Sequence, residues 1–146
     1  DTVDEKIIFQ EMLQGQEYGV DIINDLDGRF CNAIVKKKLA MRAGETDIAE
    51  TVDEPLLFDE AERLGKITGH IANMDCDFFL VNGKPYVLEM NARFGGGYPF
   101  SHVAGCNLPQ AIMNWIQEKT VSSDMLQARS GVLTYKELVL TTKKQG

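Results

Sequence analysis

Two short apolar runs joined by Asn82-Gly83 stand out in the hydrophobic pattern of the chain. The first run covers residues 74–81, and the second covers residues 86–91. An Asn-Gly pair between two such runs is a strong signal for a β-hairpin, because both residues tolerate the positive φ angles of a tight turn. Both faces of this hairpin are apolar, so we expect a sheet that is covered on both sides.

Other segments predict further strands, at residues 6–11, 17–23, 30–38 and 132–141. Residues 24–28, Asn-Asp-Leu-Asp-Gly, have the composition of a turn. Residues 41–51 are polar and irregular, which predicts a mobile loop over a ligand. Residues 94–99 contain three consecutive glycines and predict a flexible loop.

Two segments have helical periodicity. Asp53 is a candidate N-cap with Pro55 in the first turn, followed by an apolar face at Leu57, Ala61, Leu64, Thr68 and Ile71. Asn107 is a candidate N-cap of a second helix with Pro109 in its first turn and an apolar face at Leu108, Ala111, Ile112, Trp115 and Ile116. The elements predict an α+β fold, an antiparallel sheet with helices packed on one face and a ligand on the other.

Charged side chains interrupt the apolar hairpin. Asp77 lies in its first strand, Glu89 and Asn91 lie in the second, and Arg93 follows two residues later. An unpaired buried carboxylate is very costly, so a cation must meet these oxygens. Mg2+ prefers oxygen ligands, and nucleotide phosphates usually complete its shell. We therefore expect Glu89 to bridge two ions, with Asp77 on one, Asn91 on the other, and Arg93 on an acyl phosphate or carboxylate.

This metal site sets a condition on the hairpin. A two-residue Asn82-Gly83 turn pairs Val81 with Lys84, and an uninterrupted ladder then pairs Asp77 with Leu88 and turns Glu89 to the wrong face. We therefore predict an odd-length loop, such as a three-residue turn with a glycine bulge, which places Asp77 and Glu89 on one face. The competing interpretation is a set of solvated acids on an edge hairpin.

Composition limits the class of protein. The 146 residues suit one domain, with 44% hydrophobic residues and a net charge of −7, which argues against nucleic acid or an anionic membrane as the main partner. No apolar run approaches the length of a membrane span, and no signal peptide is evident. Cys31, Cys76 and Cys106 are widely spaced and lack metal-binding spacing, as expected of reduced thiols in a cytoplasmic protein.

The order of the polar motifs resembles the ATP-grasp superfamily, in its carbamoyl phosphate synthetase-like and biotin carboxylase-like branch. The resemblance extends from Ile7 to about Ile116. It rests on Gln10-Glu11, Gly15-x-Glu17-Tyr18-x-Val20-Asp21, Asp77, and Leu88-Glu89-Met90-Asn91-x-Arg93-x-Gly95-Gly96. Ala92 stands where the family often has proline, a departure that leaves the polar residues intact.

The resemblance implies ATP and Mg2+ (or Mn2+) as cofactors. It places Glu11, Met12 and Leu13 at the adenine and Glu17 at the ribose hydroxyls. It makes Asp77, Glu89 and Asn91 the metal ligands, and it assigns the reacting groups to Arg93, Asn91 and Glu89. The implied reaction is phosphorylation of a small-molecule carboxylate, followed by attack of an amine or thiol on the acyl phosphate.

The remaining candidates keep two interpretations. Alternation lets only Lys36 and Lys38 of the triple lysine share a face, so these two are the candidate phosphate ligands, and at least one lysine of the three is solvated. The glycine loop either lets backbone approach the acceptor substrate or is a plain turn. It is not a Walker A loop, because no Gly-Lys-Ser/Thr follows. His70 is expected to be structural. His102 follows the glycine loop and is a candidate contact to the substrate.

We expect residues 1–146 to be the C-terminal half of an ATP-grasp domain, because the six residues before Ile7 leave no room for the family's first lobe. That lobe is then supplied by the same or another polypeptide, and a homodimer is left open. Alone, the chain is predicted to bind ATP weakly and to turn nothing over. The alternatives are a carboxyphosphate- or carbamoyl phosphate-forming enzyme that uses bicarbonate, and a non-catalytic domain that retains the fold.

Overall fold

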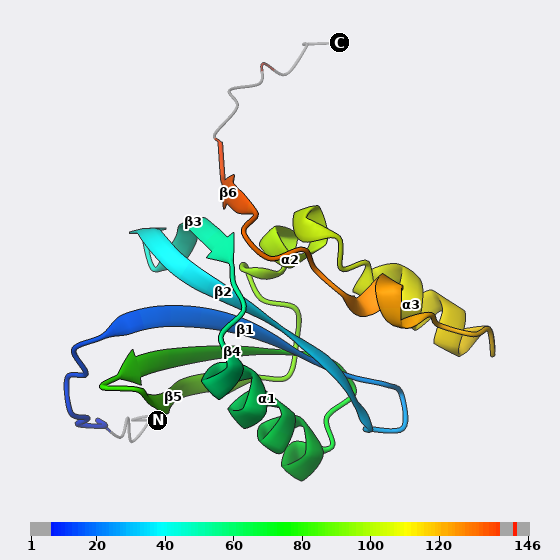
Figure 1. Ribbon diagram of the computed structural model, residues 1–146, viewed down its shortest axis with the longest axis horizontal. Coiled ribbons are helices and arrows are strands. Elements are labelled where there is room, and N and C mark those ends of the chain that lie inside the picture. The colour runs from blue at the N-terminus through cyan, green and yellow to red at the C-terminus, as the bar shows by residue number, and fades with distance from the viewer. Residues whose placement is uncertain (1–6, 138–141, 143–146) are drawn as a thin grey trace, which may run out of the picture.

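A six-stranded antiparallel sheet is the framework of the computed structural model, which describes residues 7–137 and residue 142 (Figure 1). Its strand order is β5-β4-β1-β2-β3-β6. The strands are β1 (Gln16–Asn24), β2 (Phe30–Arg42), β3 (Glu45–Thr51), β4 (Ala72–Val81), β5 (Lys84–Asn91) and β6 (Leu133–Tyr135). The helices are α1 (Pro55–Thr68), α2 (Tyr98–Ala104), α3 (Leu108–Ile116) and the 3-10 helix η1 (Ser123–Leu126). The α+β class with an antiparallel sheet is confirmed.

One face of the sheet packs against α1. Alternation along β1 turns Tyr18, Val20 and Ile22 to this side, where they meet the helical stripe of Leu57, Ala61 and Leu64. Met74, Cys76 and Phe78 of β4 complete the same cluster. The side chains of Val20, Ile22, Leu57 and Phe78 are fully buried, and burying each contributes on the order of 1.5–3 kcal/mol.

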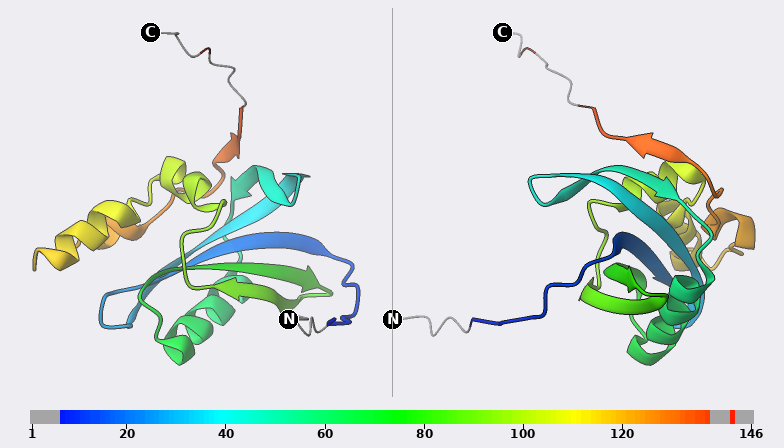
Figure 2. Two further views of the ribbon diagram at one scale, coloured as in Figure 1. Left: turned by 180° about the vertical axis from the view of Figure 1, so that it is seen from behind. Right: turned by 60° about the vertical axis from the view of Figure 1, so that its left-hand side comes forward.

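The opposite face is divided between a second apolar cluster and a polar cavity. Ile23 of β1 and Ile34 of β2 lie under α2, α3 and η1, with Tyr98, Cys106, Leu108, Ala111 and Leu126. Figure 2 shows α2 and α3 gathered near one end of the sheet, which leaves the remainder of this face to polar side chains. Helices thus lie over both faces, with α1 on one and α2 and α3 on part of the other.

The β4–β5 hairpin corrects the predicted turn. Its loop is the two-residue Asn82-Gly83 turn, with φ angles of 51° and 73°, and Val81 pairs with Lys84. The expected odd-length loop is therefore wrong. A β-bulge restores the parity instead, because Phe78 pairs with Val87 while Asp77 pairs with Glu89, which leaves Leu88 as the extra residue.

Residues 41–51 are the second correction. They form the end of β2, a turn at Ala43-Gly44 with φ angles of 50° and 81°, and all of β3, not an irregular loop. The composition hides this strand because its buried residues, Thr46, Ala49 and Thr51, are mostly polar and do not alternate regularly. Backbone pairing with β2 and β6 on its two sides stabilises β3.

Several boundaries also differ. Residues 7–15 form no strand, so the strand expected at residues 6–11 is wrong over its described part. Glu54 rather than Asp53 is the N-cap of α1, which ends at left-handed Gly69, so Thr68 and Ile71 stay exposed. Helix α2 begins inside the predicted 94–99 loop. The final strand shortens to β6, and its predicted residues 138–141 lie outside the described residues.

The second predicted helix is confirmed as α3. The Asn107 side chain caps it by accepting a hydrogen bond from the backbone N–H of Gln110 at 3.2 Å, with Pro109 in the first turn. Trp115 and Ile112 pack against the second cluster, whereas Ile116 is exposed.

Candidate functional site

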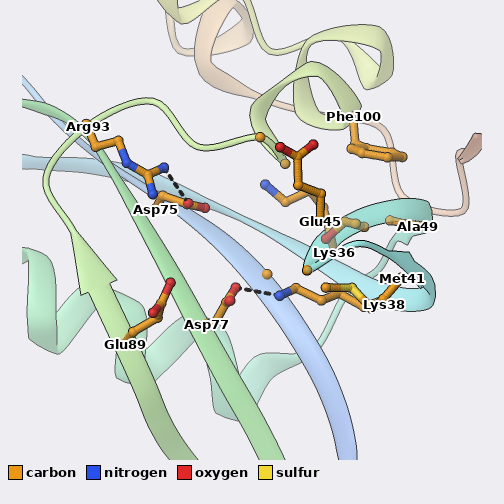
Figure 3. Close-up of a pocket in the computed structure, with 15 residues that line it drawn as sticks. Lys36, Lys38, Met41, Glu45, Ala49, Asp75, Asp77, Glu89, Arg93 and Phe100 are labelled. Carbon is orange, nitrogen blue, oxygen red and sulfur yellow. Dashed lines mark hydrogen bonds and ion pairs between the residues drawn. The ribbon is translucent and has the colours of Figure 1, made fainter. Parts of the chain in front are cut away.

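A cavity of about 170 Å³ opens on the polar part of the second face (Figure 3). It lies where β1, β2, β4 and β5 meet the glycine loop and the β2–β3 turn. Its charged lining consists of Lys36, Lys38, Glu45, Asp75, Asp77, Glu89 and Arg93, and its other lining residues are Gly19, Met41, Gly44, Thr46, Ala49, Gly96, Gly97 and Phe100.

Asp77 and Glu89 point into this cavity from adjacent strands (Figure 3). Asn91 lies one alternation beyond Glu89, and its amide donates a hydrogen bond to Glu89 Oε1 at 3.1 Å. Asn91 is not among the residues that line the cavity, but it adjoins Glu89 at its edge. The hairpin thus presents two carboxylates and an amide on the same face, as the hypothesis of a metal site requires.

Lys38 lies across the neighbouring strand to reach two acids. Its Nζ is 2.7 Å from Glu17 Oε1 and 2.8 Å from Asp77 Oδ1. Gly19 of β1 lies beneath, and a Cβ added there would stand 3.3 Å from Lys38 Cε and 3.7 Å from Asp77 Oδ1. Burial lowers the pKa of Lys38, but the hydrogen bonds to Asp77 and Glu17 outweigh it, and the pKa is raised.

Lys36 belongs to a different, fully buried network. It pairs with Asp21, and it also donates to Ser101 Oγ of α2 at 3.1 Å. Ser101 and the amide of Asn73 both donate to the same Asp21 carboxylate. A carboxylate with three donors is well compensated, so this network joins β1, β2 and β4 to α2.

Arg93 lies just beyond β5 and is held by Asp75, with a separation of 2.9 Å between Nη1 and Oδ2 (Figure 3). Burial and the neighbouring Asp21 charge raise the pKa of Asp75, whereas Lys36 and Arg93 oppose that rise. The glycine loop passes so close that a Cβ on Gly95 would lie 2.0 Å from the Asp75 carboxylate. A glycine is therefore required at position 95, because a larger side chain would overlap the Asp75 carboxylate.

The four residues assigned to the nucleoside do not line the cavity. Glu17 lies on the cavity side of β1 but is engaged with Lys38. Glu11, Met12 and Leu13 precede β1 outside any strand or helix, and none of them lines the cavity. Their assignment stays a prediction.

The charge balance of the cavity suits a cation. Four acids and three bases line it, which leaves one net negative charge, and Glu89 forms no salt bridge within residues 7–137. Among the described residues no three His, Cys, Asp or Glu side chains converge as a metal cluster. The donor set Asp77, Glu89 and Asn91 consists of two acids and an amide, which fits a hard cation whose shell is completed by phosphate oxygens.

Sequence reasoning missed Asp21, Asp75, Asn73 and Ser101. Asp21 and Asp75 carry the signal that identified Asp77, a carboxylate in an apolar strand. No comparable signal marks Ser101, which lies on a helix that the glycine-rich composition concealed. Among the other candidates, His70 bonds to Thr68 Oγ1 and to the carbonyl oxygen of Ile22, a structural role, and Tyr98 is the neighbour of His102.

The chain is similar to known proteins in sequence and in fold. The family described as "ATP-grasp in the biosynthetic pathway with Ter operon" matches residues 3–138. No curated protein matches the chain. Within the described residues, no helix combines the length and apolarity needed to cross a membrane.

Solved structures share the fold. The biotin carboxylase of Campylobacter jejuni is 19% identical with a TM-score of 0.62, covering 82% of this chain and 29% of that one. The K. lactis urea amidolyase is 20% identical with a TM-score of 0.59, covering 81% and 8%. The biotin carboxylase domain of a thermophilic 2-oxoglutarate carboxylase is 14% identical with a TM-score of 0.57, covering 77% and 28%. The chain therefore spans less than a third of each of these proteins.

Proposed function

The chain belongs to the ATP-grasp family, and from that premise we propose that it is the ATP- and magnesium-binding lobe of an ATP-dependent carboxylate–amine or carboxylate–thiol ligase. ATP-grasp domains bind ATP, typically with Mg2+, and the family is one of ligase-type enzymes. The choice of carboxylate ligation and the residues that perform it are the proposal.

The observation that carries the proposal is the pairing of Asp77 with Glu89 across the β4–β5 bulge. An extra residue inside a strand interrupts the backbone ladder, and here it turns Glu89 to the side of Asp77. A solvated edge hairpin needs no such correction of parity. Asp77, Glu89 and Asn91 are then the residues that hold Mg2+, which when bound supplies positive charge to the triphosphate oxygens.

The proposed reaction has two steps. A substrate carboxylate oxygen attacks the γ-phosphorus of ATP, the bond to the ADP oxygen breaks, and an acyl phosphate and ADP result. A nucleophile then attacks the acyl carbon, the bond to phosphate breaks, and the nucleophile loses its proton. In this proposal Arg93, which pairs with Asp75, binds the acyl phosphate oxygens. Catalysis of this kind rests on positioning and charge stabilisation.

The remaining assignments follow the same proposal. Lys38 serves the phosphates and Glu17 the ribose. The buried Lys36 contributes its charge from the cavity lining, although Asp21 already balances most of it. Glu11, Met12 and Leu13 meet the adenine once a second lobe orders that segment. We propose that this second lobe is on the same polypeptide or another, because the solved neighbours are several times longer than this chain.

Carboxyphosphate chemistry with bicarbonate is the second candidate. It is favoured by the likeness of the fold to biotin carboxylases, one of which is described as bound to bicarbonate. The same metal and phosphate residues serve both reactions, so phosphate release assayed with bicarbonate or with a panel of carboxylates distinguishes them.

Magnesium-dependent nucleotide binding by the full-length protein, as wild type and as Glu89→Gln, tests the proposal, because residues 1–146 alone are expected to bind ATP weakly. Because the variant removes one negative ligand, we expect nucleotide affinity measured by calorimetry in MgCl2 to fall by about two orders of magnitude. Glu62→Gln on the outer surface of α1 is the matched control and keeps wild-type affinity. Equal affinity of the Glu89→Gln protein and wild type contradicts the proposal.

A further inference from the structure

We propose that Lys38 occupies the place of a metal at Asp77 and exchanges with the divalent cation when Mg2+ and nucleotide bind. The inference rests on the proposed function and extends it, because it concerns which group pairs with Asp77 before a cation binds and what releases that group. Lys38 and the cation are then alternative partners of one carboxylate.

The geometry supports an exchange of partners. Lys38 Nζ lies within 2.8 Å of Asp77 Oδ1, the oxygen that faces the cavity from β4, and only 7% of the Lys38 side chain is exposed. Its second anchor, Glu17, lies on β1 and outside the metal donor set. If a cation takes Asp77, the ammonium keeps one anchor and loses the other.

Gly19 makes this bridge possible. It pairs with Asp77 on one side and with Lys36 on the other, so any side chain there would stand between Lys38 and Asp77. The added Cβ would meet Lys38 Cε at 3.3 Å, tighter than ordinary contact. The lack of a side chain at Gly19 therefore leaves room for Lys38 to reach across β1 to Asp77.

Lys36 provides an internal contrast. Its partner Asp21 is fully buried and bonded to Ser101 and Asn73 as well, so no cation entering the cavity reaches that carboxylate without unpacking α2. The Asp77 side chain is 22% exposed and lines the cavity, and it forms an ion pair with Lys38. The two lysines thus differ in their ion pairs. The Lys36–Asp21 pair is permanent, whereas the Lys38–Asp77 pair is exchangeable.

Chemical labelling tests the exchange directly. The rate of acetylation of Lys38 is measured by mass spectrometry in the protein without metal, with saturating Mg2+, and with Mg2+ plus a non-hydrolysable ATP analogue. We expect a severalfold rise with Mg2+ alone and renewed protection when the analogue supplies phosphates. Lys37, which points to the other face, is the internal control and keeps one rate throughout.

A second measurement uses Lys38→Met and the control Lys37→Met. Since the substitution removes a positive charge that competes with the cation for Asp77, we expect Lys38→Met to bind Mn2+ alone roughly tenfold more tightly than wild type, measured by electron paramagnetic resonance. The same variant is expected to bind the ATP analogue more weakly in saturating Mg2+. Changes of opposite sign are the signature of the exchange, whereas Lys37→Met changes neither affinity.

The outcomes separate the two proposals. If Lys38 labelling with saturating Mg2+ alone equals that without metal, in a protein that binds Mg2+ and the analogue, the exchange is overturned and the proposed function stands. A loss of both Mn2+ and nucleotide affinity in Lys38→Met also overturns the exchange. Absence of any Mg2+-dependent nucleotide binding by wild type overturns the proposed function and the exchange with it.

Discussion

Strand β1 presents opposite chemistry on its two faces. Tyr18, Val20 and Ile22 enter a dry apolar cluster under α1, whereas the alternate positions Glu17, Gly19 and Asp21 face charged partners on β2 and β4. One face contributes stability through burial alone. The other face holds charges that are stable only as sets, so its residues are constrained by their partners rather than by size.

The largest effect is expected from Asp21→Ala, which tests whether the polar face also stabilises the fold. The variant leaves the Lys36 ammonium buried without its counter-charge, so the free energy of unfolding in urea should fall by about 3–5 kcal/mol. Asp27→Ala, at an exposed pair with Arg29, is the control and should change stability by less than about 0.5 kcal/mol. A loss for Asp21→Ala no larger than that of the control would show that the network does not stabilise the fold.

Leu57→Ala probes the apolar face with a comparable or slightly smaller effect. The side chain is fully buried in the α1 cluster, so we expect a loss of about 3 kcal/mol in the free energy of unfolding. Because Leu57 packs on the face of the sheet opposite the cavity, affinity of the folded variant for Mg2+ and the ATP analogue should equal that of wild type. A large fall in that affinity at temperatures where the variant is folded would mean that the two faces are coupled.

A smaller effect is expected for Tyr98→Phe at the boundary between the apolar cluster and the cavity. The phenol donates to the carbonyl oxygen of Cys106 and accepts from the backbone N–H of Leu108, both at 3.0 Å. Its loss leaves a buried N–H without a partner, at a cost of about 1–2 kcal/mol in thermal or urea unfolding. The pKa of the phenol is raised by burial, so it stays protonated at neutral pH. Wild-type stability of the variant would show that water replaces the hydroxyl.

The effect with the smallest change at neutral pH concerns thiols buried in the two apolar clusters. Burial raises the pKa of Cys76 to about 12 and that of Cys106 to about 11. Both folded-state values exceed the ordinary value of about 8.5, so the unfolded chain releases protons first and stability falls as pH rises above about 9. Each thiol should contribute a slope of about 1 kcal/mol per pH unit in urea titrations between those values.

Cys76→Ala removes one thiol from that titration. The slope of stability against pH should become shallower, whereas Cys31→Ala, at an exposed position, should alter it less. Equal slopes in wild type and Cys76→Ala would contradict the assignment of the titration to buried thiols.

The contrast between the faces also explains what the sequence predicted. Apolar positions at period two and near period four identified β1, the start of β2, most of α1 and all of α3, because burial on one side leaves a repeating pattern. Strand β3 escaped because polar Thr46 and Thr51 fill buried positions, and α2 escaped because three glycines precede it. Backbone pairing and loop closure stabilise these two elements, and neither leaves a hydrophobic period.

The site divides in the same way. Carboxylates in apolar strands led to Asp77 and Glu89, whose shared face the structure supports through the bulge at Leu88. A bulge depends on the fit of the whole sheet. Counting residues across the turn therefore predicted correctly that one extra residue is needed, but it placed that residue in the turn instead of in β5. The partners Asp75 for Arg93 and Asp21 for Lys36 lie 18 and 15 residues away on neighbouring strands, and spacing within one strand does not reveal them.

The central claim, a divalent cation held between β4 and β5, is tested most directly by anomalous scattering from crystals grown with Mn2+ and a non-hydrolysable ATP analogue. The account predicts a manganese peak within coordination distance of the Asp77 and Glu89 carboxylates, with Asn91 beside Glu89 and Lys38 Nζ moved away from Asp77. Bound nucleotide with manganese coordinated elsewhere, or with neither carboxylate as a ligand, would contradict it.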